Sequence, residues 1–171
     1  MTAYYFNTNP LVSWAESKAP SPDPRSSKIG RCVEQLVNDP ASITAVSEIT
    51  LVEFHNKLCD HWRASETPQY DSAWADSVQA ELMRWIADGQ LVVLNQPPKL
   101  IEKAIAYVTF ATREHGRRLK AWDAVHLFHA SDWARDQGQK VNLVTSDADF
   151  PSILDVYPEF KEFVNILDPA T

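Results

Sequence analysis

The sequence predicts an α/β protein in which helices cover both faces of a mainly parallel sheet. Short runs of aromatic and β-branched residues alternate along the chain with longer stretches whose apolar residues recur at helical spacing. Strands that alternate with helices favour parallel pairing, because each helix carries the chain back to the starting edge of the sheet. With 171 residues, of which 44% are hydrophobic, the chain has the size and composition of one domain, residues 1–171.

The order of the expected elements follows from the apolar runs and from the prolines and glycines between them. Asn9 would cap the first helix, which has Pro10 in its first turn, and residues 17–27, with three prolines, would form a loop. The expected strands are residues 4–6, 42–46, 91–94, 141–145 and 163–167, and the later helices are residues 29–37, 47–62, 72–87, 97–116 and 121–138.

Charge and composition exclude several classes of protein. The net charge of −7 argues against nucleic-acid binding through a broad basic surface, although residues 113–120 carry four basic side chains that could contact a backbone or be a solvated helix end. No apolar run reaches the roughly 18 residues of a membrane span. The N-terminus lacks the features of a secretion signal, so we expect a cytoplasmic location. Cys32 and Cys59 are expected to be small buried thiols rather than a disulfide.

Four acidic residues stand at junctions between predicted strands and helices, or on the first turns of those helices. They are Glu53 in TLVEF (50–54), Asp123 in AWDAVH (121–126), and Asp147 and Asp149 in NLVTSDADF (142–150). In an open α/β sheet, ligands bind beyond the carboxyl ends of the strands. Carboxylates that meet there repel unless a hard cation such as Mg²⁺ or Mn²⁺ neutralises them. We therefore expect Glu53, Asp123 and Asp147 to converge with Asn7 at one edge of the sheet, within reach of one ion, and Asp149 to lie close by.

Together with FNTNPL (6–11), these segments resemble the motifs of PIN-domain ribonucleases, and most of all those of the VapC-type toxins of bacterial toxin–antitoxin pairs. The resemblance extends over nearly the whole chain. It implies a three-layer α/β/α sandwich with a central, mainly parallel sheet of about five strands. It also implies a metal-dependent endoribonuclease that cleaves RNA phosphodiester bonds with one or two Mg²⁺ or Mn²⁺ ions.

Residue roles and partners follow from the same resemblance. The partners it implies are an RNA substrate and an antitoxin protein, which would occupy a groove formed by the helices at 53–62 and 74–86. Homodimerisation could bury more of that apolar surface. Thr145 or Ser146 could orient a metal-bound water. The implied catalytic acids are Glu53, Asp123 and Asp147, and the implied metal ligands are Asn7, Glu53, Asp123, Asp147 and Asp149.

The first motif departs from the family pattern, because the family has aspartate where this chain has Asn7. An amide oxygen can approach a metal, but it brings no charge and cannot accept a proton as a base. The asparagine is compatible with an inactivating substitution, a naturally degenerate enzyme or a tolerated variant. One alternative function is therefore a non-catalytic PIN-like binding protein. A phosphatase of the haloacid-dehalogenase type is less favoured, because its nucleophilic aspartate would stand where Asn7 and Asn9 lie.

The spacing of the histidine and tryptophan residues is explained better by helix packing than by a role in ligand binding. His126 and His129 are three residues apart, but no third nitrogen or sulfur ligand is near them in the sequence, so an apolar helical face is favoured over a transition-metal site. His126 could also support Asp123 one turn earlier. Trp62, Trp74 and Trp85 recur with leucine and valine at helical spacing, which indicates core or interface positions rather than base-stacking platforms.

Overall fold

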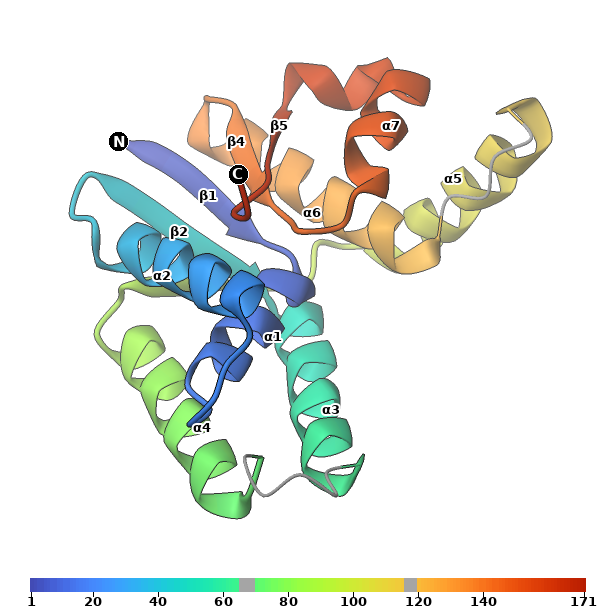
Figure 1. The fold of residues 1–171 in the computed structure, drawn as a ribbon. Helices are drawn as coiled ribbons and strands as arrows, with labels where there is room; N and C mark the ends of the chain where they lie inside the picture. Colours follow the sequence, from blue (N-terminus) through green and yellow to red (C-terminus); the bar gives the residue numbers. More distant parts are fainter. Residues whose placement is uncertain (65–69, 116–119) are drawn as a thin grey trace.

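The structure is a computed structural model that describes residues 1–64, 70–115 and 120–171 (Figure 1). Within these residues, five strands pair in parallel throughout and form one sheet in the order β3-β2-β1-β4-β5. The number of strands and their direction agree with the sequence prediction. The strands are β1 (Thr2–Phe6), β2 (Ser42–Ser47), β3 (Leu91–Leu94), β4 (Val141–Val144) and β5 (Val164–Leu167).

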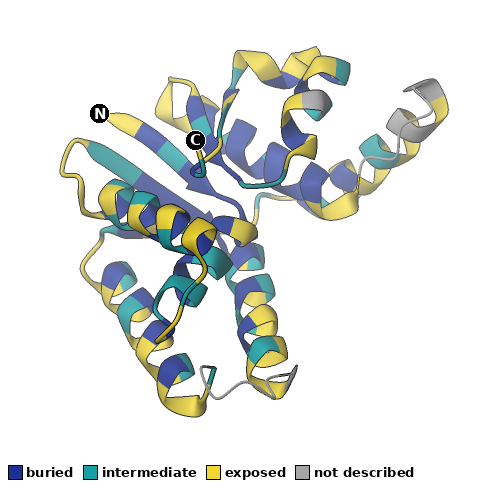
Figure 2. Cartoon of the chain, viewed as in Figure 1, coloured by how far each residue is buried: buried dark blue, intermediate teal, exposed yellow. Residues whose placement is uncertain are grey.

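Helices cover both faces of this sheet, and each face has its own apolar core (Figures 1 and 2). Successive side chains on a strand point to opposite faces, so Tyr5 belongs to one core and Phe6 to the other. The three-layer α/β/α prediction is confirmed. The helices that contribute to the Phe6 core are α1 (Thr8–Ser17), α2 (Pro24–Asn38), α3 (Glu48–Ala64) and α4 (Ser72–Ala87), and those of the Tyr5 core are α5 (Leu100–His115), α6 (Ala121–Gln137), α7 (Asp149–Val156) and the 3-10 helix η1 (Pro158–Glu162).

Two helix starts differ from the sequence prediction. The first helix begins at Thr8 and its cap is Asn7 rather than Asn9. The second begins at Pro24, inside the stretch expected to be a loop, and Asp23 caps it by accepting hydrogen bonds from two backbone N–H groups. Proline is well suited to the first helical position, since its fixed φ angle matches the helix and its missing N–H would have no partner there. The short helix α7 was not predicted.

Cysteine and tryptophan positions are only partly as expected. Both cysteines are free thiols, but Cys59 is exposed and Cys32 is half-buried, so the prediction that both are buried is wrong for Cys59. Trp74 and Trp85 are buried in the core between α1, α3 and α4, whereas Trp62 is exposed. A helical pattern shows that residues share a face, but it does not show how far that face extends under the neighbouring helix.

Two features of the described residues bear on the remaining predictions. None of their helices is long and apolar enough to cross a membrane. Arg113 is exposed on α5, while Arg117 and Arg118 of the expected basic patch lie outside the described residues.

The topology of the sheet determines where a ligand can bind. The chain begins in the middle of the sheet with β1, continues outward through β2 to β3, and then returns to place β4 on the other side of β1. The backbone N–H of Asn7, just after β1, donates to the carbonyl oxygen of Val144 at the end of β4 (3.0 Å). The connections leave β1 and β4 in different directions along the sheet, and such a switch point is where open α/β sheets bind ligands.

Candidate active site

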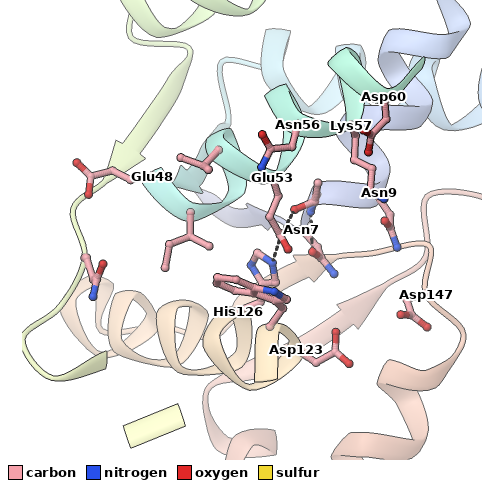
Figure 3. Close-up of a pocket in the computed structure, with 15 residues that line it drawn as sticks. Asn7, Asn9, Glu48, Glu53, Asn56, Lys57, Asp60, Asp123, His126 and Asp147 are labelled. Atoms are coloured by element: carbon pink, nitrogen blue, oxygen red, sulfur yellow. Dashed lines mark hydrogen bonds and ion pairs between the residues drawn. The ribbon is translucent and has the colours of Figure 1, made fainter. Parts of the chain in front are cut away.

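A pocket of about 560 Å³ lies at this carboxyl edge of the sheet (Figure 3). Its walls come from the residues after β1, α3 from Glu48 to Asp60, the loop after β3, the first turns of α6 and the loop after β4. Four residues singled out by their positions in the sequence share the pocket, although 140 positions separate the first of them from the last. They are Asn7, Glu53, Asp123 and Asp147.

Asn7 is buried and both ends of its amide are hydrogen bonded. Its Oδ1 accepts from the backbone N–H of Thr8 (2.6 Å), and its Nδ2 donates to the hydroxyl oxygen of Thr145 (3.3 Å). The first of these bonds caps α1, and the second joins the end of β1 to the end of β4. Asn7 therefore has a structural task in addition to any contact that it makes with a ligand.

Glu53 is held in place by two neighbours on different elements. The Thr8 hydroxyl donates a short hydrogen bond to Glu53 Oε2, and His126 Nε2 lies 3.2 Å from the same oxygen (Figure 3). Partial burial raises the pKa of the Glu53 carboxyl, but the hydrogen bonds from His126 and Thr8 outweigh burial and keep this pKa below its ordinary value. Glu53 is consequently a carboxylate throughout the neutral pH range.

A buried polar network supports His126 from behind. Tyr5 OH lies 3.1 Å from His126 Nδ1 and donates to the Ser47 hydroxyl oxygen (3.0 Å), which in turn lies 2.9 Å from the hydroxyl of Thr50. Burial raises the pKa of Tyr5 to about 12. Sequence reasoning placed His126 on an apolar face or beside Asp123, and the structure corrects this, because its ring bridges Tyr5 and Glu53. The only feature of the sequence that pointed to a role for His126 in the site was its position one turn after Asp123, a candidate acid.

His129 does lie on the apolar side, as expected. Its ring is buried and stacks on Tyr5, with ring centroids 6.2 Å apart and an interplanar angle of 15°. Burial lowers the pKa of His129 to about 4, so this imidazole is neutral at physiological pH.

Asp123 lies in the pocket wall formed by α6, and its charge is poorly compensated. Its side chain is buried, and this burial is the main cause that raises its pKa to about 6. The positive charge of Lys120 opposes the shift, while the negative charge of Asp147 adds to it. Asp123 and Glu53 thus share one pocket but have pKa values that move in opposite directions.

Asp147 and Asp149 are arranged around the turn that follows β4. The N–H of Asp147 donates to the Thr145 hydroxyl oxygen (3.2 Å), and Asp147 Oδ1 accepts from the N–H of Asp149 (2.9 Å). Lys120 Nζ lies 3.7 Å from Asp147 Oδ2 and 3.6 Å from Asp149 Oδ2. Asp149 has a side chain that is 68% exposed and lies outside the set of described residues that line the pocket.

The donor chemistry of the pocket fits a hard divalent cation, although the acids do not form one compact cluster. Among the described residues, no three Asp, Glu, His or Cys side chains form a group that could hold a single ion. Mg²⁺ commonly takes one or two carboxylates and keeps several waters. Asp123 and Asp147 are two such carboxylates, and a cation beside them would offset both the burial of Asp123 and the negative charge of Asp147, which together raise the Asp123 pKa. The assignment of metal ligands stays a prediction.

Other residues of the pocket were not singled out from the sequence. Trp122, Val52 and Ile49 make part of the wall apolar, and the remaining wall includes the side-chain amides of Asn9, Asn56 and Gln96. Trp122 directly precedes Asp123, and this adjacency was the one available signal. Thr8, which binds Glu53, gave no signal beyond its place in the first motif.

Comparison with solved structures identifies the fold. VapBC2 from Rickettsia felis, solved with a DNA fragment from its promoter, has a TM-score of 0.58 and 15% identity over 98% of this chain and 100% of that chain. FitAcB from Neisseria gonorrhoeae has a TM-score of 0.57 and 14% identity over 97% of each chain. Mycobacterium tuberculosis VapC20, a toxin that cleaves the sarcin–ricin loop, has a TM-score of 0.56 and 17% identity over 88% of this chain and 94% of that chain.

This chain has the fold of the VapC-type PIN-domain toxins. The fold predicted from the sequence motifs is confirmed, and it extends over almost the full length of the solved VapC-type chains. No family model matches the sequence, and no curated protein matches it. At 14–17% identity, the likeness to solved structures concerns the fold, and the chemistry has to be argued from the pocket.

Proposed function

We propose that this protein is a Mg²⁺- or Mn²⁺-dependent endoribonuclease that acts in the cytoplasm as the toxin of a toxin–antitoxin pair. The observation that carries the proposal is the shared pocket of Glu53, Asp123 and Asp147 at the switch point of a VapC-type fold. One protein with this fold, VapC20, is a toxin that cleaves the sarcin–ricin loop.

The side chains of the pocket would divide the work of phosphodiester hydrolysis. Asp123 and Asp147 would hold the ion, which when bound lowers the pKa of water and stabilises charge on the phosphate. Glu53 remains ionised, so it can orient the attacking water and accept its proton. Thr8 and His126 keep the Glu53 carboxylate in one orientation. Lys120 can move from the two aspartates to the phosphate backbone, because its side chain is exposed.

Cleavage of a structured RNA, with and without EDTA, tests this proposal. The wild-type protein should cut in Mg²⁺ or Mn²⁺ and should stop cutting in EDTA. Asp147→Asn should be inactive under both conditions. Cleavage that persists in EDTA, or that is equal in the Asp147→Asn variant, would remove the metal-dependent mechanism.

A non-catalytic binding protein is the second candidate, and Asn7 is the observation that favours it. The amide is fully engaged with Thr8 and Thr145, and it brings no negative charge to the pocket. If this alternative holds, neither the wild-type protein nor the Asn7→Asp variant cuts RNA in Mn²⁺. Cleavage restored by Asn7→Asp alone would instead identify a nuclease whose first acid has been replaced.

The antitoxin partner is proposed to bind on the surface of α3. The structure separates the tryptophans of the expected groove, because Trp74 is buried and donates from Nε1 to the carbonyl oxygen of Ala15 (2.9 Å), whereas Trp62 is 51% exposed. Large exposed apolar side chains commonly mark an interface, and a homodimer could use the same surface.

Trp62→Ala and Trp74→Ala distinguish the interface from the core. Trp62→Ala should weaken association with the co-expressed antitoxin and leave the melting temperature nearly unchanged. Trp74→Ala should destabilise the fold by about 3–5 kcal/mol, as is typical of a buried tryptophan. If Trp62→Ala leaves the amount of co-purified antitoxin unchanged, this surface of α3 is not the antitoxin interface. Sedimentation of the protein alone tests whether it forms a homodimer.

A further inference from the structure

Trp122 is a large aromatic side chain left open to solvent inside the candidate active site. It exposes 51% of its surface and contributes to the wall of the pocket. It precedes Asp123 directly, and it is four residues before His126, so Trp122 and His126 share one face of α6. Trp122 and Asp123 thus enter the same pocket from the first turn of α6.

Helix α3 provides a second apolar surface in the pocket. Ile49 and Val52 of α3 line the same pocket, and Val52 is 61% exposed. Apolar groups that stay open to water after folding cost free energy, and within a pocket they usually mark a ligand site. The pocket thus offers apolar surface on both α6 and α3, suited to a flat, weakly polar group.

Polar groups of a particular kind complete the pocket. The side-chain amides of Asn9, Asn56 and Gln96 belong to its lining, as does Lys57 (Figure 3 labels Asn9, Asn56 and Lys57). Amides carry both donors and acceptors, which match the mixed pattern on the edge of a nucleobase. A lysine beside them suits a phosphate.

We propose that Trp122 is the stacking platform for an unpaired base of the RNA substrate, next to the phosphate that is cleaved. The inference rests on the proposed function and adds a residue that positions the RNA beside the candidate metal ligands. A base within an A-form helix is covered on both faces by its neighbours, so it cannot stack on a side chain unless it is unpaired or extruded. Because Trp122, Asp123 and Asp147 line the same pocket, the phosphate of a base stacked on Trp122 would lie in the part of the pocket that holds the acids.

A protein segment is a less suitable occupant of this apolar surface. The pocket also contains Glu53, Asp123 and Asp147, and a peptide seated there would have to place basic side chains beside these carboxylates as well as apolar ones on the indole. A nucleotide brings its base to the apolar side and its phosphate to the acidic side, where a divalent ion can join the phosphate to the carboxylates.

Binding of RNA in Mn²⁺ tests the role of Trp122 apart from cleavage, with Glu53→Gln introduced into every protein compared so that cleavage is slow. The probe is a short fluorescently labelled single-stranded oligoribonucleotide, compared with a fully paired duplex of the same sequence by fluorescence anisotropy. Trp122→Ala should weaken single-strand binding by about tenfold, within the range measured for the loss of one stacked base, and Trp122→Phe should keep most of the affinity. Duplex binding should be weaker and should change little in either variant.

Trp62 provides a matched control, because it is also 51% exposed but is not among the described residues that line the pocket. Trp62→Ala should bind the single strand as the wild-type protein does. Equal affinity of Trp122→Ala and the wild-type protein would overturn the inference and leave the exposed indole to a protein contact. An equal loss in Trp62→Ala, or an equal loss for the duplex, would also overturn it.

Cleavage, measured separately in Mn²⁺, keeps this inference distinct from the proposed function. A wild-type protein that binds single strands through Trp122 but cuts no RNA would support the stacking role and contradict the nuclease. A protein that cuts RNA while Trp122→Ala keeps full affinity would support the nuclease and contradict the stacking role. Thermal melting of Trp122→Ala, expected to match the wild-type curve, shows that the variant is folded.

Discussion

On the wall of the pocket built by α1 and α3, Glu53 accepts a hydrogen bond from Thr8 and lies 3.2 Å from His126 Nε2. On the wall built by α6 and the loop after β4, Asp123 is buried beside Asp147, and Lys120 is a partner of Asp147 that is itself largely exposed. The pKa of Glu53 is lowered and that of Asp123 is raised to about 6. The two carboxylates therefore differ in pKa because Glu53 has partly buried hydrogen-bond partners, whereas Asp123 does not.

This difference indicates which wall needs a ligand. A carboxylate whose charge is already satisfied by the protein gains little from a cation, whereas a buried and poorly compensated pair gains much. Environments that move two pKa values apart commonly separate two chemical roles. We infer that the wall with Asp123 and Asp147 binds metal, and that the wall with Glu53 positions the nucleophile.

The largest expected effect is on cleavage. Asp147→Asn and Glu53→Gln should each lower the rate of RNA cleavage by about 10²–10⁴-fold, the usual range for a positioned acid or base. Only Asp147→Asn should also lose Mg²⁺ or Mn²⁺ binding by isothermal titration calorimetry. Equal losses of metal affinity in the two variants would show that the two walls do not divide these roles.

Stability should respond to the buried network and not to the exposed pair. Tyr5→Phe removes the hydroxyl between His126 and Ser47, and the polar groups left unpaired should lower the free energy of unfolding by about 1–3 kcal/mol. Lys120→Gln breaks only exposed ion pairs, which usually contribute about 0–1 kcal/mol. Urea denaturation of both variants measures the two losses of stability. A loss for Lys120→Gln as large as that for Tyr5→Phe would show that the exposed ion pairs matter as much as the buried network.

The pH dependence of stability should show that ionisation of Asp123 is unfavourable in the folded protein. The folded-state pKa of about 6 is above the ordinary aspartate value of 3.8, so ionisation costs more in the folded state than in the unfolded state. The wild-type protein should thus lose stability as pH rises from about 4 to about 6, and the cost should then stay constant. Asp123→Asn avoids this cost.

The expected gain for Asp123→Asn is about 1–2 kcal/mol at pH 8 in EDTA, with no gain at pH 4. Thermal unfolding at several pH values measures it. A variant that is equally stable to the wild-type protein at pH 8 would show that the Asp123 carboxylate is compensated in the folded state.

Asn7→Asp should have a small effect on the free energy of metal binding. The new carboxylate can keep the cap on Thr8 and adds one negative charge to the pocket, so Mg²⁺ affinity should rise about tenfold or less, which corresponds to about 1.4 kcal/mol. Calorimetry measures the affinity, and RNA cleavage with and without EDTA shows whether activity rises with it. Equal affinity and equal cleavage in both forms would show that position 7 does not serve the metal.

The sequence by itself determined the class of fold and the location of the pocket. Periodicities of two and of 3.6 residues are local, and they predicted β3 at Leu91–Leu94 with the observed bounds. Because parallel strands all end at one edge, the acids after different strands could be expected to meet, and Glu53, Asp123 and Asp147 do line one pocket.

Only the tertiary structure decided which of these side chains are in contact, how far each is buried and how its pKa is shifted. His126 contacts Glu53, which is 73 positions away in the sequence. Asn7 caps α1 and also donates a hydrogen bond to Thr145. Trp122 is exposed, whereas Trp74 is buried. A local pattern shows which residues share a face, but it does not give the distance between two faces or the water left between them. Burial and hydrogen bonding depend on that distance, and they separate the pKa of Glu53 from that of Asp123.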